Sequence, residues 1–167
     1  MPKPGGMLRY GIPAYRLPRE ELERDIERIT SMGVKIICGT AIGKKPSLVQ
    51  LRKEHDAIFI GTGAWEDMTM GVPGEKGHGV ASGIELLKKA ELGQVKKIKG
   101  EAVVVGGGDT AIDAARTALR LGAKSVTVVY RRTREEMPVQ PEEITEALEE
   151  GVKFEFLVAP VEVIRNG

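Results

Sequence analysis

Three consecutive glycines, Gly106, Gly107 and Gly108, are the residues of this sequence best suited to binding chemistry. They follow a β-branched run that ends at Val105 and precede a helical pattern that includes Ala111. The spacing Gly106-x-Gly108-x-x-Ala111 is typical of turns that bind a dinucleotide. Gly106 permits a tight turn, Gly108 leaves room for a pyrophosphate, and Ala111 lets the helix pack close to the strand. The alternative is an ordinary strand-to-helix turn without a ligand.

The residues that follow the next strand indicate which dinucleotide would fit. Sites that prefer NAD usually carry Asp or Glu about 20 residues beyond the glycines, where the carboxylate accepts from the ribose 2′-OH. This sequence has Tyr130 there, followed by Arg131 and Arg132. Guanidinium groups stay charged and bind a phosphate bidentately, so we expect NADP(H) rather than NAD(H). A solvated basic turn is the alternative.

The flanking segments predict the elements that position these residues. Ala102–Val105 and Ser125–Val129 are short β-branched runs typical of buried strands, and a helix that ends at Gly122 lies between them. A helix over Glu142–Glu150 and a strand over Val152–Val158 follow. This alternation predicts the α/β class and a Rossmann-like (three-layer) nucleotide-binding fold.

The first half of the chain has a similar alternation. We expect a loop, two helices, two strands and a further helix, in the order Met1–Pro18 (loop), Arg19–Met32 (helix), Val34–Cys38 (strand), Ser47–Glu54 (helix), Asp56–Gly61 (strand) and Gly83–Leu92 (helix). A lysine-rich connector over Gly93–Gly100 then suggests a domain boundary. The sequence therefore predicts two partial dinucleotide-binding domains, residues 1–95 and 96–167.

Composition narrows the function classes. The chain has 167 residues, 25 of them basic and 24 acidic, and its net charge of +1 favours neither a nucleic acid nor a membrane surface as partner. Its single cysteine, Cys38, excludes an intrachain disulfide framework and an iron–sulfur cluster held by cysteines of this chain. Neither a signal peptide nor an apolar run of about 18 residues is present, so we expect the cytoplasm. We assign no catalytic residue and no metal ligand, because His55 and His78 lack partners at ligand spacing.

Several long motifs, in order, resemble one enzyme family. They are Gly5–Pro18, Asp56–Trp65, Gly71–Glu75, Val103–Ala123 and Val128–Pro138. Together they are similar to the small (beta) subunits of NADPH-dependent glutamate synthase and related FAD/NAD(P)H-dependent oxidoreductases. The wider group includes adrenodoxin-reductase-like flavoproteins and the amino-terminal half of dihydropyrimidine dehydrogenase. The resemblance covers essentially the whole chain and implies hydride transfer from NADPH to FAD, with electrons passing on to iron–sulfur clusters.

The resemblance also implies site residues. For NADP(H), the phosphate-binding turn matches Gly107, Gly108, Asp109 and Thr110, to which the glycine spacing adds Gly106 and Ala111, and the 2′-phosphate pair matches Arg131 and Arg132. For FAD, the resemblance implies Met7, Leu8 and Arg9 near the flavin, Thr40 near the adenine, and Gly61, Thr62 and Gly63 at the pyrophosphate. Glu143 matches an acidic residue that contacts the nucleotide, and a first-turn glutamate favoured by the helix dipole is the equally weighted alternative.

The family pattern extends beyond this chain in both directions. The first FAD fingerprint and the cysteine-rich region for iron–sulfur clusters would precede Met1, and the rest of both nucleotide domains would follow Gly167. We therefore expect an internal piece of a longer enzyme whose clusters lie in the missing part or in a partner, such as the large (alpha) subunit of glutamate synthase. The competing hypothesis is a non-enzymatic NADP(H)-binding module or an inactive fragment. Asp109 departs from the family, in which an uncharged Asn is also common.

Overall fold

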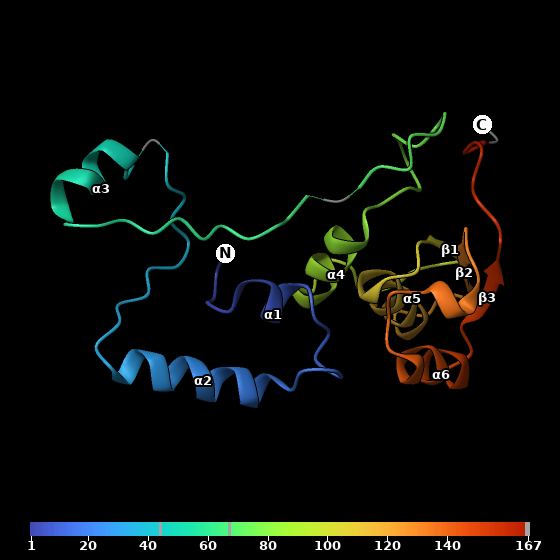
Figure 1. Cartoon of the computed structure of the whole chain (residues 1–167), viewed down its shortest axis with the longest axis horizontal. Coiled ribbons are helices and arrows are strands. Elements are labelled where there is room, and N and C mark those ends of the chain that lie inside the picture. The colour runs from blue at the N-terminus through green and yellow to red at the C-terminus, as the bar shows by residue number, and fades with distance from the viewer. Residues whose placement is uncertain (44, 67, 166–167) are drawn as a thin grey trace. The chain divides into compact units, whose positions relative to one another are not determined.

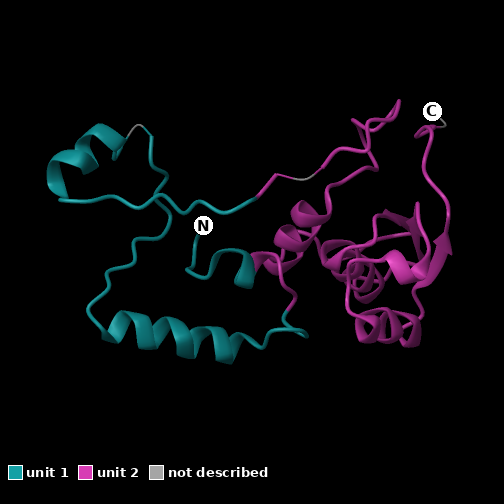
Figure 2. Ribbon diagram, viewed as in Figure 1, with its two compact units in different colours: residues 1–9, 14–64 teal, residues 10–13, 65–167 magenta. Residues whose placement is uncertain are grey.

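The computed structural model describes residues 1–43, 45–66 and 68–165, and the chain forms two compact units (Figure 2). Unit 1 comprises Met1–Arg9 and Ala14–Ala64, and unit 2 comprises Tyr10–Pro13 and Trp65–Gly167. The assignment of 1–95 and 96–167 to two nucleotide domains remains a prediction. Within the described ranges, no helix is long and apolar enough to cross a membrane.

Unit 2 contains a parallel sheet with the strand order β1-β2-β3 (Figure 1). Its strands are β1 (Glu101–Val105), β2 (Ser125–Tyr130) and β3 (Lys153–Phe156). Parallel neighbours need a crossover connection, and helices α5 (Asp109–Arg120) and α6 (Pro141–Glu149) supply the two crossovers. The register pairs the last residue of β1, Val105, with Val129 of β2, so both strands end at the same edge. This repeated strand–helix order confirms the predicted α/β class.

The core of unit 2 lies between α5 and one face of the sheet. All residues from 111 to 118 of α5 are buried, together with Val126 and Val128 of β2. Alanines at 111, 114, 115 and 118 keep the helix narrow. The sheet, α6 and helix α4 (Gly83–Glu91) can therefore all pack against α5. Val103 points to the opposite face of the sheet and is 66% exposed.

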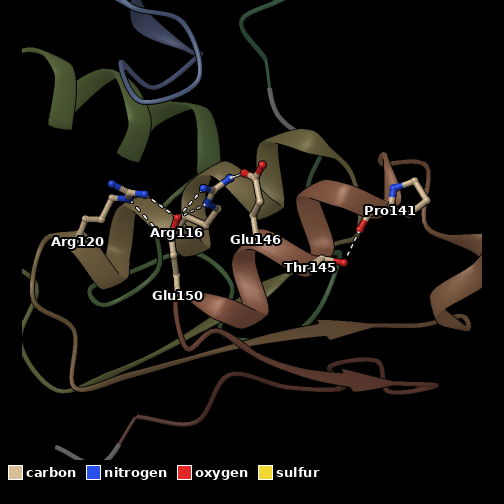
Figure 3. Close-up of polar contacts among 6 residues, drawn as sticks. All are labelled: Arg116, Arg120, Pro141, Thr145, Glu146 and Glu150. Carbon is tan, nitrogen blue, oxygen red and sulfur yellow. Dashed lines mark hydrogen bonds and ion pairs between the residues drawn. The ribbon is translucent and has the colours of Figure 1, made fainter.

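An arginine–glutamate network joins α5 to α6 (Figure 3). The Arg116 side chain is only 6% exposed and donates to Glu146 at 2.8 Å and through Nε to Glu150 at 2.9 Å. Arg120, one helical turn further, donates to the same Glu150 carboxylate at 2.6 Å. A buried guanidinium needs such partners, because an unpaired charge in the interior is strongly unfavourable.

Unit 1 supplies two helices that match the sequence predictions, α2 (Arg19–Ser31) and α3 (Leu48–Glu54). Acidic residues occupy the first turn of α2, where the helix dipole favours them. Ser47 caps α3, since its hydroxyl accepts from the N–H of Gln50 at 3.1 Å.

Three predictions about elements were wrong. Val34–Cys38 and Asp56–Gly61 are not strands: their backbone is assigned to no sheet within the described part of the chain. A β-branched run favours an extended backbone, but a strand also requires a hydrogen-bonded neighbour. The predicted loop Met1–Pro18 contains a short helix, α1 (Gly6–Tyr10). In unit 2, the segment after β2 contains a 3-10 turn, η1 (Arg134–Glu136).

Candidate functional site

The glycine turn connects the end of β1 to the start of α5. Gly106 has a φ of +138°, a backbone conformation that residues with a side chain rarely adopt. Its N–H donates to the carbonyl oxygen of Val129 at 3.1 Å, which attaches the turn to the neighbouring strand. The chain therefore leaves the sheet at the edge where β1 and β2 both end.

The three glycines have different surroundings. A Cβ on Gly106 would lie 3.3 Å from the Cβ of Ala111, and a Cβ on Gly107 would lie 2.6 Å from ring carbons of Tyr130. A Cβ on Gly108 would meet no heavy atom within 4 Å. Packing inside the chain thus explains the absence of a side chain at Gly106 and Gly107 but not at Gly108. A ligand group that approaches the backbone there would supply the missing reason.

The first turn of α5 is suited to an anion. Gly108 is the N-cap residue and contributes no side-chain hydrogen bond. The amides of Asp109 and Thr110 follow, at the end of a helix where backbone N–H groups have no intrahelical acceptor. These groups and the positive end of the helix dipole attract a phosphate. Asp109 is exposed, and its carboxylate is the one group here that would repel a phosphate at close range.

Arg131 and Arg132 lie at the same edge, directly after β2. Both side chains are exposed, and neither guanidinium makes an ion pair or side-chain hydrogen bond with another described residue. Because Val105 pairs with Val129, these arginines follow β2 at the level where the glycine turn follows β1. The structure thus brings together the glycine turn and the arginine pair, two groups that are more than 20 residues apart in the sequence.

Glu143 lies in the first turn of α6 and is half-buried. Pro141 occupies the first helical position, and Glu142 and Glu143 follow where acidic residues are favoured. The helix-dipole explanation of Glu143 is therefore satisfied, and its contact with a nucleotide remains a prediction.

The residues predicted to bind FAD belong to unit 1. Met7, Leu8 and Arg9 lie in α1, and Leu8 is half exposed. The guanidinium of Arg9 is buried and donates to the carbonyl oxygen of Pro4 at 2.5 Å and to Glu23 at 2.8 Å. The bond to Glu23 connects α1 to α2, and the bond to Pro4 fixes the segment before α1, so Arg9 has a structural role that the sequence did not indicate.

The other two predicted FAD segments lie on exposed, irregular backbone. The Thr40 hydroxyl donates to the carbonyl oxygen of Cys38 at 3.4 Å. Gly61, Thr62 and Gly63 are exposed, and Gly63 has a φ of +75°, which glycine adopts without strain. FAD binding by these residues remains a prediction.

Sequence reasoning missed two residues that support the loop after β2. Glu136 forms a capping box with Thr133 around η1, and Leu157 follows β3 with a φ of +59°. The spacing Thr133-x-x-Glu136 is a readable capping signature, which could have identified the first. No sequence signal indicates the second, because leucine rarely adopts a positive φ.

Comparison with known proteins identifies relatives over almost the whole chain. A sequence profile described as "Pyridine nucleotide-disulphide oxidoreductase" matches residues 2–167. The beta subunit of the NADPH-Fe(3+) oxidoreductase of Geobacter sulfurreducens is 50% identical over 96% of this chain and 24% of its own length. The small chain of the Escherichia coli NADPH glutamate synthase is 37% identical over 99% of this chain and 38% of its own length. The chain therefore spans well under half the length of these relatives.

Among solved structures, FprA from Mycobacterium tuberculosis in complex with NADPH has a similar fold. The TM-score is 0.78 at 16% sequence identity, and the match covers 99% of this chain and 53% of that protein. At this low identity the similarity concerns the fold alone.

Proposed function

Because the chain belongs to the pyridine nucleotide-disulphide oxidoreductase family, we propose that it binds NADP(H) and contributes to an FAD site in a longer oxidoreductase. In this proposal, unit 2 holds the NADPH that donates a hydride, and residues of unit 1 contact the flavin that accepts it. NADPH is thereby oxidised to NADP⁺ as the flavin is reduced. The protein's contribution is to bind and orient the two cofactors, and the cofactors supply the redox chemistry.

The observation that carries the proposal is the pair of unpartnered guanidiniums beside the glycine turn. Arg131 and Arg132 have no acceptor among the described residues, and the open space at Gly108 lies by the same sheet edge. A dinucleotide with a 2′-phosphate matches both features, because its pyrophosphate suits the helix start and its extra phosphate suits the arginines. NAD(H) has the pyrophosphate but lacks the 2′-phosphate, so it would match the helix start and not the arginines.

The flavin part of the proposal rests on the motif resemblance. Met7, Leu8, Arg9, Thr40 and Gly61–Gly63 match family positions around FAD. The ion pair between the buried Arg9 and the partly exposed Glu23 supports a fixed backbone for α1, on which a flavin-contacting loop would depend.

The electron acceptor is proposed from the relatives. Three relatives are named as subunits of larger enzymes, and they are 37–50% identical to this chain. The enzymes are the NADPH-Fe(3+) oxidoreductase, the NADP(+)-dependent formate dehydrogenase from Moorella thermoacetica, and glutamate synthase. We propose that electrons pass from the flavin to a partner subunit, with iron–sulfur clusters outside this chain as the carriers. The large subunit of glutamate synthase is one such partner, and the cytoplasm is the proposed compartment.

The test is nucleotide affinity in the intact protein that contains this chain. Replacing both arginines, Arg131→Ala with Arg132→Ala, should raise the Kd for NADPH by about 10- to 100-fold, because charge-assisted hydrogen bonds to the 2′-phosphate are lost. The Kd for NADH should stay within about twofold. The matched control is Arg120→Ala, which removes a guanidinium at the other end of α5 and should leave both affinities unchanged.

Equal affinities of the unmodified protein for NADPH and NADH would contradict the proposal. So would a double variant that binds NADPH as tightly as the unmodified protein.

A further inference from the structure

Tyr130 occupies the position at which NAD-preferring sites carry a carboxylate, and its ring has an unusual environment. A Cβ on Gly107 would lie 2.6 Å from the Cδ2 and Cε2 atoms of that ring. The ring therefore packs directly against the backbone of the glycine turn, in the space that a side chain at residue 107 would occupy. Tyr130 also directly precedes Arg131, so one residue connects the pyrophosphate turn to the proposed 2′-phosphate site.

The hydroxyl of Tyr130 fixes the loop that follows the arginines. It donates to the carbonyl oxygen of Glu136 at 3.0 Å. The Glu136 side chain in turn accepts from the N–H of Thr133 at 3.1 Å, as part of the capping box around η1. These two hydrogen bonds close residues 130–136 into a loop. We call this segment the arginine loop, because it contains Arg131 and Arg132.

The backbone on both sides of Arg131 is held as well. The N–H of Leu157 donates to the carbonyl oxygen of Arg132 at 3.2 Å, and the N–H of Val158 donates to that of Tyr130 at 3.1 Å. Leu157 adopts a φ of +59° while its side chain is 72% exposed. A positive φ is unfavourable for a leucine, and little burial of this exposed residue offsets the strain. The strained conformation is therefore associated with the hydrogen bonds that hold the arginine loop.

We propose that Tyr130 is a specificity-determining positioning residue, which holds the arginine loop against the glycine turn and so contributes to the preference for NADPH over NADH. This inference rests on the proposed NADP(H) site. Preorganised guanidiniums lose less conformational entropy when they bind a phosphate, and this advantage applies only to the nucleotide that carries the 2′-phosphate. Without the Tyr130–Glu136 bond, the arginines remain but their loop loses one of the hydrogen bonds that fix it.

The test compares the Kd values of NADPH and NADH in the intact protein. Tyr130→Phe keeps the ring against Gly107 and removes only the hydroxyl. It should raise the Kd for NADPH about three- to tenfold and leave that for NADH within twofold. Glu136→Ala removes the acceptor for Thr133 and should act in the same direction. Glu136→Gln retains an acceptor oxygen and should behave like the unmodified protein.

A double-mutant cycle separates this inference from the proposed site itself. In the background of Arg131→Ala with Arg132→Ala, Tyr130→Phe should have no further effect on NADPH affinity, since no arginine remains to be positioned. If the arginine variant loses the NADPH preference but Tyr130→Phe alone binds both nucleotides normally, the role of Tyr130 is refuted and the site stands. Equal weakening of NADPH and NADH with a lowered Tm would also refute it, because a merely structural role predicts that result. An arginine variant with unchanged NADPH affinity would refute the site itself.

Discussion

The three adjacent glycines show that one residue type can serve different purposes within a single turn. Gly106 is required by its positive φ, and Gly107 by the ring of Tyr130. Gly108 has a φ of −95° and open space around it, so neither backbone strain nor packing inside the chain requires a glycine there. The proposed functional requirement at Gly108 and the structural one at Gly107 are thereby separated by a single position.

This separation gives a prediction for Gly108→Asn. Asparagine is a favoured N-cap residue, so the variant should fold with unchanged or slightly higher stability. Its side chain would occupy the space proposed for the pyrophosphate, and the Kd values for NADPH and NADH should both rise by about tenfold or more. Thermal unfolding and nucleotide titration of the intact protein measure the two effects.

Gly107→Ala is the matched comparison, because the added methyl would collide with the ring of Tyr130. That variant should lower the Tm. Normal nucleotide binding by Gly108→Asn would show that the open space is not a ligand site.

At the scale of elements, α5 and α6 are joined by charges as well as by apolar packing. Burial by itself raises the pKa of the Glu150 carboxyl, but the hydrogen bonds from Arg116 and Arg120 outweigh burial and lower this pKa below its ordinary value of 4.5. The folded state therefore binds this proton less readily than the unfolded state does. It follows that Glu150 stabilises the fold at neutral pH and loses this contribution as the pH falls below about 4.5.

The corresponding prediction concerns Glu150→Gln. At pH 7 the variant should unfold with a free energy about 1–3 kcal/mol lower than the unmodified protein, because buried Arg116 loses one of its two charged acceptors and keeps Glu146. The difference should shrink as the pH falls from about 5 to about 3, where Glu150 becomes protonated in the unmodified protein too. Denaturant unfolding at several pH values measures it, and a difference independent of pH would contradict the assignment.

The helices that sequence analysis predicted correctly are defined by local interactions. The strands β1, β2 and β3 were also predicted, from a composition that two other segments share without forming strands. The helix α5 has buried alanines at helical spacing, and α3 has a serine N-cap, so both are identified by residues within one or two turns. Val34–Cys38 and Asp56–Gly61 have strand-like composition, yet pairing depends on distant segments that local sequence does not specify. The short helix α1 was missed because five residues that begin with a glycine give no periodic signal.

The candidate site also contains features that the sequence predicts and features that only the tertiary structure shows. The glycine turn is contiguous in sequence, and the position of the arginines follows from the strand–helix–strand order, so both were predictable. The contacts of Tyr130 with Gly107 and Glu136, and the hold of Leu157 on Arg132, depend on tertiary structure. A sequence shows that a tyrosine replaces the usual carboxylate, but only the fold shows where its ring and hydroxyl lie.

At the scale of the whole molecule, the chain supplies binding surfaces rather than a redox group of its own. It contains one cysteine, so two cysteines of this chain cannot form a redox-active disulfide. Its nearly balanced charge, with a net value of +1, gives no general attraction to a strongly acidic or basic partner. Under the proposed function, the redox chemistry would be supplied by NADPH and the flavin, and the transfer of hydride between them is open to a direct test.

The intact protein should be purified with the visible absorbance of a bound flavin, and NADPH added without oxygen should bleach it as hydride reduces the flavin. The variant Arg131→Ala with Arg132→Ala should keep the flavin spectrum, because these arginines are assigned to the NADPH. It should require about 10- to 100-fold more NADPH to bleach at half the maximal rate, whereas Arg120→Ala should match the unmodified protein. A flavin that NADPH fails to bleach would contradict hydride transfer. A colourless protein that still binds NADPH would instead support a non-enzymatic NADP(H)-binding module, because the arginine site would then be present without an electron acceptor.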